Sequence, residues 1–177
     1  MRIYLDTSAF IKGFRNEERS EIVHSILEKC ANGQLVIVLS LWTLTESLSA
    51  LDKAYNMKGS ISQPEANSII ARMLSYSYNL NKEGHLDIIE PDGDIITRSW
   101  AFISRRHLSA DDALHTMCAM IGKSDIMLLA DNYFASMLKK EREVSTAEDI
   151  AEEQYSFEIL NLLEDQDYER LERQIRL

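Results

Sequence analysis

Near its start the chain reads IYLDTSAFI, residues 3–11, in which a short apolar run ends in an acid, Asp6. The run before Asp6 predicts a buried strand, and the apolar spacing after it predicts the start of a helix. Because this strand is so short, the carboxylate of Asp6 must emerge where the strand ends, at one edge of a sheet. The opening therefore predicts an α/β fold with an acid at a strand-to-helix junction.

Three more acids stand at junctions of the same kind: Glu46, Asp112 and Asp131. In a parallel sheet such junctions share the carboxyl edge, where open α/β sheets bind ligands. Four carboxylates gathered there repel one another unless a divalent cation lies among them, and an all-oxygen ligand set favours Mg²⁺ or Mn²⁺. The pattern predicts a metal-dependent enzyme that acts on phosphates.

Each acid taken alone also has a purely structural explanation. Asp6 and Asp131 fit the N-cap position of the helix that follows each of them. Glu46 fits the third position of a capping box that starts at Thr43, and Asp112 fits the same position after Ser109. For a single acid the two explanations are evenly matched, but four acids in such contexts favour a shared site.

Apolar periodicity predicts the order β-α-α-β-α-α-β-α-α-β-α. The predicted strands are 2–5, 35–39, 86–89 and 126–130, and the predicted helices are 8–14, 17–31, 44–55, 62–82, 95–107, 110–121 and 132–140. Alternation of this kind is typical of a three-layer α/β/α sandwich, with helices on both faces of a mostly parallel sheet of four to five strands.

The composition changes toward the C-terminus, which predicts two parts: a main domain over 1–146 and an acidic helical extension over 147–177. Of the net charge of −10, residues 141–177 carry −8 and residues 1–140 only −2. The overall charge therefore does not exclude a nucleic-acid partner. Between Tyr155 and Ile175 the apolar residues recur at helical spacing, which predicts an amphipathic helix or helix pair.

Composition also narrows the class of protein. We find neither a membrane-spanning run nor a signal sequence, so the sequence predicts a cytoplasmic protein without a membrane partner. Cys30 and Cys118 are expected to be buried free thiols. The four histidines lack zinc-ligand spacing, and His115 is expected to be a helix residue at the rim of the core.

Four segments together resemble the PIN-domain family, in particular the VapC-type toxin ribonucleases. They are YLDTSAFI (4–11), LSLWTLTE (39–46), DALHT (112–116) and LLADNYF (128–134), in the family's order and within about residues 1–140. The chain departs from the family at Leu129, where a threonine is common. The resemblance implies a PIN-like sandwich, with Asp6, Glu46, Asp112 and Asp131 as catalytic metal ligands.

The resemblance also implies an activity and partners. The expected activity is an Mg²⁺- or Mn²⁺-dependent endoribonuclease, the toxin of a type II toxin–antitoxin pair, which hydrolyses RNA with a metal-activated water. The expected partners are RNA and an antitoxin protein. Independently of the resemblance, the apolar stripe of the C-terminal segment is expected to dock on the body of the protein or on a second copy of the chain, as a homodimer. Ser8 is expected to hold the first carboxylate through its hydroxyl, and Asp111 to act as an outer partner of the site.

Two questions stay open at the level of sequence. Basic residues that either guide the RNA backbone or lie on ordinary solvated helix faces are Lys12, Arg15, Arg98, Arg105, Arg106 and Lys123. The alternative functions are a non-catalytic PIN-like module for protein assembly and a structure-selective DNA nuclease that uses the same acids.

Overall fold

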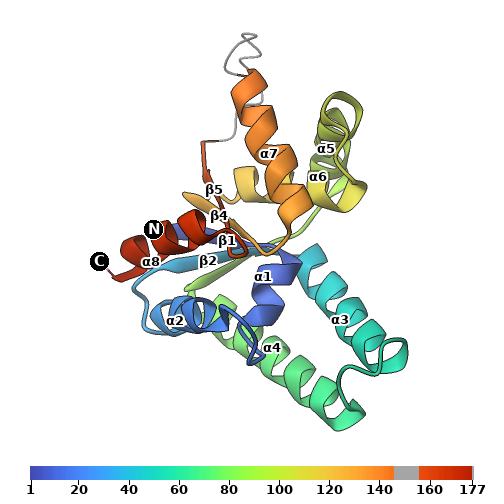
Figure 1. Cartoon of the computed structure of the whole chain (residues 1–177), viewed down its shortest axis with the longest axis vertical. Helices are drawn as coiled ribbons and strands as arrows, with labels where there is room; N and C mark the ends of the chain where they lie inside the picture. The colour runs from blue at the N-terminus through green and yellow to red at the C-terminus, as the bar shows by residue number, and fades with distance from the viewer. Residues whose placement is uncertain (146–155, 177) are drawn as a thin grey trace.

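The computed structural model describes residues 1–145 and 156–176, without the side chains of residue 105 and residues 141–145. Strands and helices alternate through most of this range (Figure 1). In chain order they are β1 (Arg2–Leu5), α1 (Thr7–Lys12), α2 (Ser20–Ala31), β2 (Val36–Ser40), α3 (Leu41–Asn56), α4 (Gln63–Glu83), β3 (Leu86–Ile89), α5 (Gly93–Arg106), α6 (Ala110–Ile121), β4 (Ile126–Leu129), α7 (Asn132–Ser145), β5 (Glu158–Asn161) and α8 (Asp165–Arg176).

One sheet of five strands, in the order β3-β2-β1-β4-β5, forms the centre of the fold. Every neighbouring pair is parallel, and Ile3 of β1 pairs with Ile37 of β2 on one side and Ile126 of β4 on the other. The parallel α/β sheet predicted from the sequence is confirmed. Because all strands run the same way, their C-terminal ends lie at one edge.

Helices cover both faces of this sheet, which confirms the three-layer sandwich. Alternate residues of each strand point to opposite faces. Ile3 and Leu5 pack in a core with residues of α1 to α4 and α8, whereas Tyr4 packs in a second core with residues of α5, α6 and α7. Figure 1 shows these two groups of helices on either side of the strands.

The C-terminal segment combines a strand and a helix, where the apolar spacing alone predicted one or two helices. The helix is α8, whose Leu171 and Ile175 are buried in the core shared with α2. Residues 158–161 instead form a fifth strand that pairs with β4. Without this strand, the backbone groups along the outer edge of β4 would have no hydrogen-bond partners. The predicted domain boundary after residue 146, and Tyr155, lie outside the described residues.

Two helices begin three residues away from where the apolar pattern predicted, for local reasons. Helix α3 begins at Leu41 because the Ser40 hydroxyl accepts from the Thr43 amide, with the Thr43 hydroxyl completing the capping box. The predicted box from Thr43 to Glu46 is therefore wrong, and Glu46 lies inside the helix. Helix α2 begins at Ser20, not at residue 17, because Arg19 is left-handed with φ 62°.

The two cysteines, Cys30 and Cys118, are buried free thiols as predicted. None of the helices within residues 1–145 and 156–176 has both the length and the hydropathy to cross a membrane.

Candidate active site

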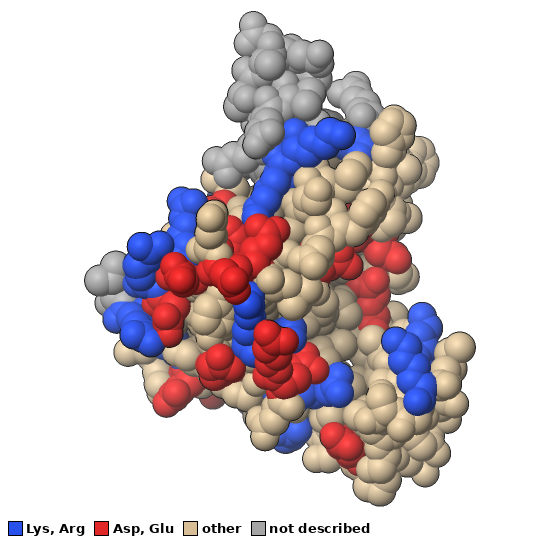
Figure 2. Space-filling view, viewed as in Figure 1, with Lys and Arg blue, Asp and Glu red and all other residues tan. Residues whose placement is uncertain are grey.

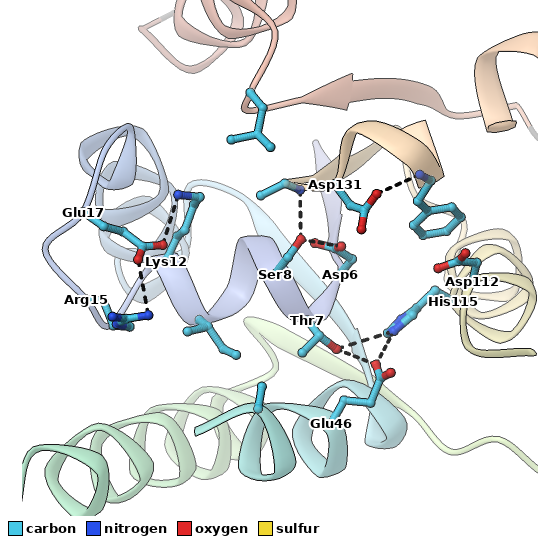
Figure 3. Close-up of a pocket in the computed structure, with 15 residues that line it drawn as sticks. Asp6, Thr7, Ser8, Lys12, Arg15, Glu17, Glu46, Asp112, His115 and Asp131 are labelled. Carbon is cyan, nitrogen blue, oxygen red and sulfur yellow. Dashed lines mark hydrogen bonds and ion pairs between the residues drawn. The ribbon is translucent and has the colours of Figure 1, made fainter. Parts of the chain in front are cut away.

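A cavity of about 480 Å³ opens at the carboxyl edge of the sheet, and it brings the predicted site residues together. The four acids come from four different places: the end of β1, the middle of α3, the first turn of α6 and the start of α7. Ser8 lines the same cavity. Figure 3 shows the labelled Asp6, Asp112 and Asp131 side chains pointing toward one another, with Glu46 facing them from α3.

Asp6 is the most enclosed of these acids, with 5 % of its surface exposed. One carboxylate oxygen accepts from the Ala9 amide at 2.7 Å and caps α1, and the other accepts from the Ser8 hydroxyl at 2.6 Å. The Ser8 oxygen in turn accepts from the amide of Ala130 at 3.0 Å. Ser8 thus joins the end of β1 to the residue that follows β4.

Burial raises the pKa of Asp6 from 3.8 to about 6, although hydrogen bonds from Ser8 and Ala9 lower it. Repulsion from Asp131 adds to the increase. In the metal-free protein the folded state therefore binds a proton at Asp6 more tightly than the unfolded chain does.

Stability of the metal-free protein is expected to depend on pH through Asp6. Its folded pKa lies above the unfolded one, so its contribution to stability is lost as pH rises from about 4 through about 6. The loss amounts to about 3 kcal/mol for a shift of about two units. Urea unfolding in EDTA of the parent and of Asp6→Asn, which keeps the capping oxygen, measures it. We expect the variant to gain stability relative to the parent by this amount between about pH 4 and pH 7. A difference independent of pH would contradict the prediction.

Asp112 and Asp131 combine capping positions with places in the cavity. Asp131 accepts from the Phe134 amide at 2.8 Å, and the amide of Asp112 donates to the Ser109 hydroxyl at 3.1 Å. Asp131 thus caps α7 and also lines the cavity. Asp112 contributes its amide to the cap of α6 and also lines the cavity, so the structural and functional explanations do not compete. Burial raises the pKa of Asp112, as does repulsion from Asp131, against the lowering effect of Ser109.

Glu46 is held by donors that the sequence analysis did not connect with it. Its Oε2 accepts from the Thr7 hydroxyl and lies 2.6 Å from Nε2 of His115. Since a carboxylate only accepts, His115 donates through Nε2–H. Burial alone would raise the pKa of Glu46, but the His115 and Thr7 hydrogen bonds hold it below its usual range.

His115 lies in α6 at the rim of the core, as predicted, and it also takes part in the site, which the sequence analysis did not predict. It is buried and lines the cavity, and its Nδ1 lies 2.7 Å from the Tyr4 hydroxyl. When the ring is neutral, Tyr4 donates to Nδ1, which fixes the ring with Nε2–H toward Glu46. The signal available in the sequence was its place one turn after Asp112, on the face of α6 that carries the acid.

The remaining candidates lie at or beyond the margin of the cavity. Asp111 is exposed and lines a neighbouring cavity with Lys53 and Trp42. Leu129 is fully buried in the core beside α7, so its side chain does not line the site. Of the candidate basic residues, Lys12 and Arg15 line the cavity.

The other candidate basic residues with described side chains lie elsewhere. Arg98 pairs with Asp94 on α5, and Lys123 precedes β4, at the opposite edge of the sheet. The guanidinium of Arg106 stacks on Phe102, with the two centres 4.7 Å apart. The side chain of Arg105 lies outside the described part of the chain.

The donor set fits a hard divalent cation, although the acids are spread around the cavity. Among the described residues, no three acidic, histidine or cysteine side chains are placed to hold one metal ion directly. Mg²⁺ keeps several water ligands and takes only one or two carboxylates directly, so such a spread is compatible with it. Burial, together with repulsion from Asp131, raises the pKa of both Asp6 and Asp112. A cation bound beside these carboxylates would favour their charged forms and so oppose both effects.

Comparisons with known proteins identify the family of this chain and a similar fold. The family model of the PIN domain matches residues 3–140. The structure is similar to the crystal structure of VapC20 from Mycobacterium tuberculosis, a toxin that cleaves the sarcin–ricin loop. The TM-score is 0.53 at 17 % identity, over 76 % of this chain and 93 % of that one. At this identity the likeness concerns the fold. No curated protein matches the chain.

Proposed function

The chain belongs to the PIN-domain family, and we propose that it is an endoribonuclease that depends on Mg²⁺ or Mn²⁺. The observation that carries the proposal is the meeting of Asp6, Glu46, Asp112 and Asp131 around one cavity, from four separate elements. Asp6 and Asp131 follow neighbouring parallel strands, but Glu46 lies in the middle of α3 and Asp112 in the first turn of α6, so helix capping alone gives no reason for all four to surround one space. Carboxylates that surround one space instead suit a site that binds a cation and a phosphate together.

In this proposal the residues divide the work. Asp6, Asp112 and Asp131 would hold the cation, directly or through water, while Ser8 fixes the orientation of Asp6. When bound, Mg²⁺ activates water and neutralises charge that develops on the phosphate. Thr7 and His115 keep Glu46 ionised and aimed at the cavity.

RNA is the proposed substrate, and unpaired loops are the proposed target, because proteins read RNA mainly where its bases are unstacked. The similarity to VapC20, which cleaves an RNA loop, supports this choice. By the same similarity we propose a toxin role, with an antitoxin protein that covers the cavity.

RNA cleavage by the purified protein is expected to require a divalent cation. A pool of structured RNAs should be cut in Mg²⁺ or Mn²⁺, remain intact in EDTA, and be cut again when Mg²⁺ is restored in excess. The reason is that the carboxylates alone cannot neutralise charge on the phosphate. Gel analysis of the RNA measures the result. Cleavage that persists in EDTA would contradict a metal mechanism.

A second candidate function is a non-catalytic assembly module, and the state of Glu46 favours it. Its carboxylate is already occupied by Thr7 and His115, as in a structural network. The two functions differ in their response to Mg²⁺. A nuclease of this type should be stabilised by Mg²⁺ and cut RNA, whereas an assembly module should do neither.

A further inference from the structure

Two cations at one end of the cavity share a single acid. Lys12 ends α1, and its Nζ donates to Oε1 of Glu17 at 3.0 Å; Arg15 lies 3.3 Å from Oε2 of the same carboxylate. Figure 3 shows the Glu17 carboxylate between the two basic groups, apart from the four acids. Among the described residues that line the cavity, Lys12 and Arg15 supply the lysine and arginine charge, and Glu17 neutralises part of it.

Lys12 does not lie on a solvated helix face. Its side chain is 11 % exposed, and its Nζ also donates to the backbone carbonyl of Glu18 at 3.0 Å. This second hydrogen bond holds the Lys12 ammonium in place even if the Glu17 carboxylate moves away. Glu17 is more exposed than Lys12, at 30 %, so its carboxylate can turn into water.

Arg15 also lies at the boundary between two cavities. It lines the cavity with the acids and a second one of about 480 Å³, whose wall includes Asn16, His24 and Arg72. The guanidinium of Arg72 donates to the carbonyl of Phe14 at 2.8 Å, which fixes it beside this second space. The two cavities thus share Arg15 in their walls, and the wall of the second adds the positive charge of Arg72 as well as the acid Glu65.

We propose that Lys12 and Arg15 form a phosphate-binding subsite for the RNA nucleotide next to the one being cut, and that Glu17 covers this subsite until RNA displaces it. A phosphodiester carries one negative charge on two terminal oxygens, as a carboxylate does. It can therefore take the place of Glu17 with the same two donors. The flanking nucleotide would then lie in the second cavity. This inference rests on the proposed function, because it assumes an RNA substrate.

The test compares Glu17→Gln with Glu18→Gln in the full-length chain. Glu18 is adjacent, has a side chain 84 % exposed and does not line the cavity, so both variants lose one negative charge from the same loop. All proteins, the reference included, carry Asp112→Asn, so that a labelled single-stranded RNA is bound in Mg²⁺ without being cut; a gel checks that it stays intact. Fluorescence anisotropy gives the dissociation constants.

Glu17→Gln is expected to bind the RNA about threefold to fivefold more tightly than Glu18→Gln, the size expected for removing a partly exposed ion pair. In a chain that also carries Lys12→Met and Arg15→Gln, the advantage of Glu17→Gln should disappear. Lys12→Met alone should weaken binding and reduce the salt dependence of log K by about 0.7, the value for one lost contact with a single-stranded phosphate. Melting curves check that every variant is folded.

The outcomes separate this inference from the proposed function. Equal binding by Glu17→Gln and Glu18→Gln, in a protein that binds and cuts RNA in its parent form, would overturn the subsite alone. An advantage of Glu17→Gln that survives the loss of both cations would also overturn it, since long-range charge would then explain the gain. Absence of RNA binding by every variant, with no cleavage by the parent, would overturn both.

Discussion

Asp112→Asn is expected to abolish RNA cleavage and, at the same time, to stabilise the metal-free protein. Burial and the neighbouring Asp131 raise the pKa of Asp112, so its charge opposes folding at neutral pH. Removing the charge should raise the free energy of unfolding in EDTA by on the order of 1 kcal/mol, because sites arranged for function store such repulsion. In a chain of this size that corresponds to a rise in Tm of about 2–4 °C.

In Mg²⁺ the order of stability is expected to reverse, with the parent more stable than Asp112→Asn. Mg²⁺ at about 100 times its Kd should stabilise the parent by about 2.7 kcal/mol through mass action, and the variant much less. Cleavage by the variant should fall by about 10²-fold to 10³-fold or more, the scale of losing one group that stabilises developing charge. Melting curves in EDTA and in Mg²⁺, together with a cleavage assay, measure both effects.

Asp111→Asn is the matched control, because it removes the same charge from the adjacent residue, which is exposed and lines a different cavity. We expect it to keep both the Mg²⁺ shift and most of the activity. If Asp112→Asn instead melts lower than the parent in EDTA and keeps the full Mg²⁺ shift, Asp112 caps α6 and is no ligand.

Ending the chain at residue 146 is expected to destroy the fold. The segment that would be lost contributes six buried apolar side chains: Phe157, Ile159, Leu160, Leu162, Leu171 and Ile175. At about 1.5–3 kcal/mol each, their burial contributes roughly as much as the whole stability of a typical domain, about 5–15 kcal/mol. The cut also exposes the edge of β4, which favours aggregation. Solubility and light scattering measure the outcome.

Point variants in α8 test whether the stability of the domain depends on the C-terminal segment, in a chain that still folds. Leu171→Ala, at a fully buried position of α8, should cost about 2–5 kcal/mol in urea unfolding. Glu169→Ala, on the exposed side of the same helix, should change the stability by no more than about 0.5 kcal/mol. A soluble truncated chain as stable as the parent would show that the segment does not support the domain.

Strands and helices were predicted correctly from the sequence where the apolar pattern fitted only one of them. The prediction was wrong where a short apolar run fitted both a strand and a helix. Residues 2–5 and 126–129 are fully or largely buried runs between turn signals, and both are strands as predicted. The stretch around Ile159 and Leu162 also fits helical spacing, and nothing within it reveals that β4 needs a partner. Residues 158–161 thus form a strand because they pair with β4, and their own sequence does not indicate this.

The parts of the candidate site that follow directly from the topology of the sheet could be predicted from the sequence. Asp6 and Asp131 follow strands, so the parallel sheet was enough to place them at one edge. The role of His115 was not predictable in this way, because its partners Tyr4 and Glu46 lie 111 and 69 positions away in the chain. Contacts between side chains over such separations leave no periodic signal in a single sequence.

The position of β1 at the centre of the sheet has a consequence for synthesis on the ribosome. Its partners are β2 and β4, so residues 3–5 wait for residues 126–128 before the sheet can close. At about 5–20 residues per second, that delay lasts roughly 6–25 s for each nascent chain. During this delay Asp131 has not yet been made, and α6 and α7 do not yet cover one face of β1 and β2. A growing chain therefore lacks the complete set of four acids until its last quarter is made, and during that interval its exposed apolar strands favour aggregation.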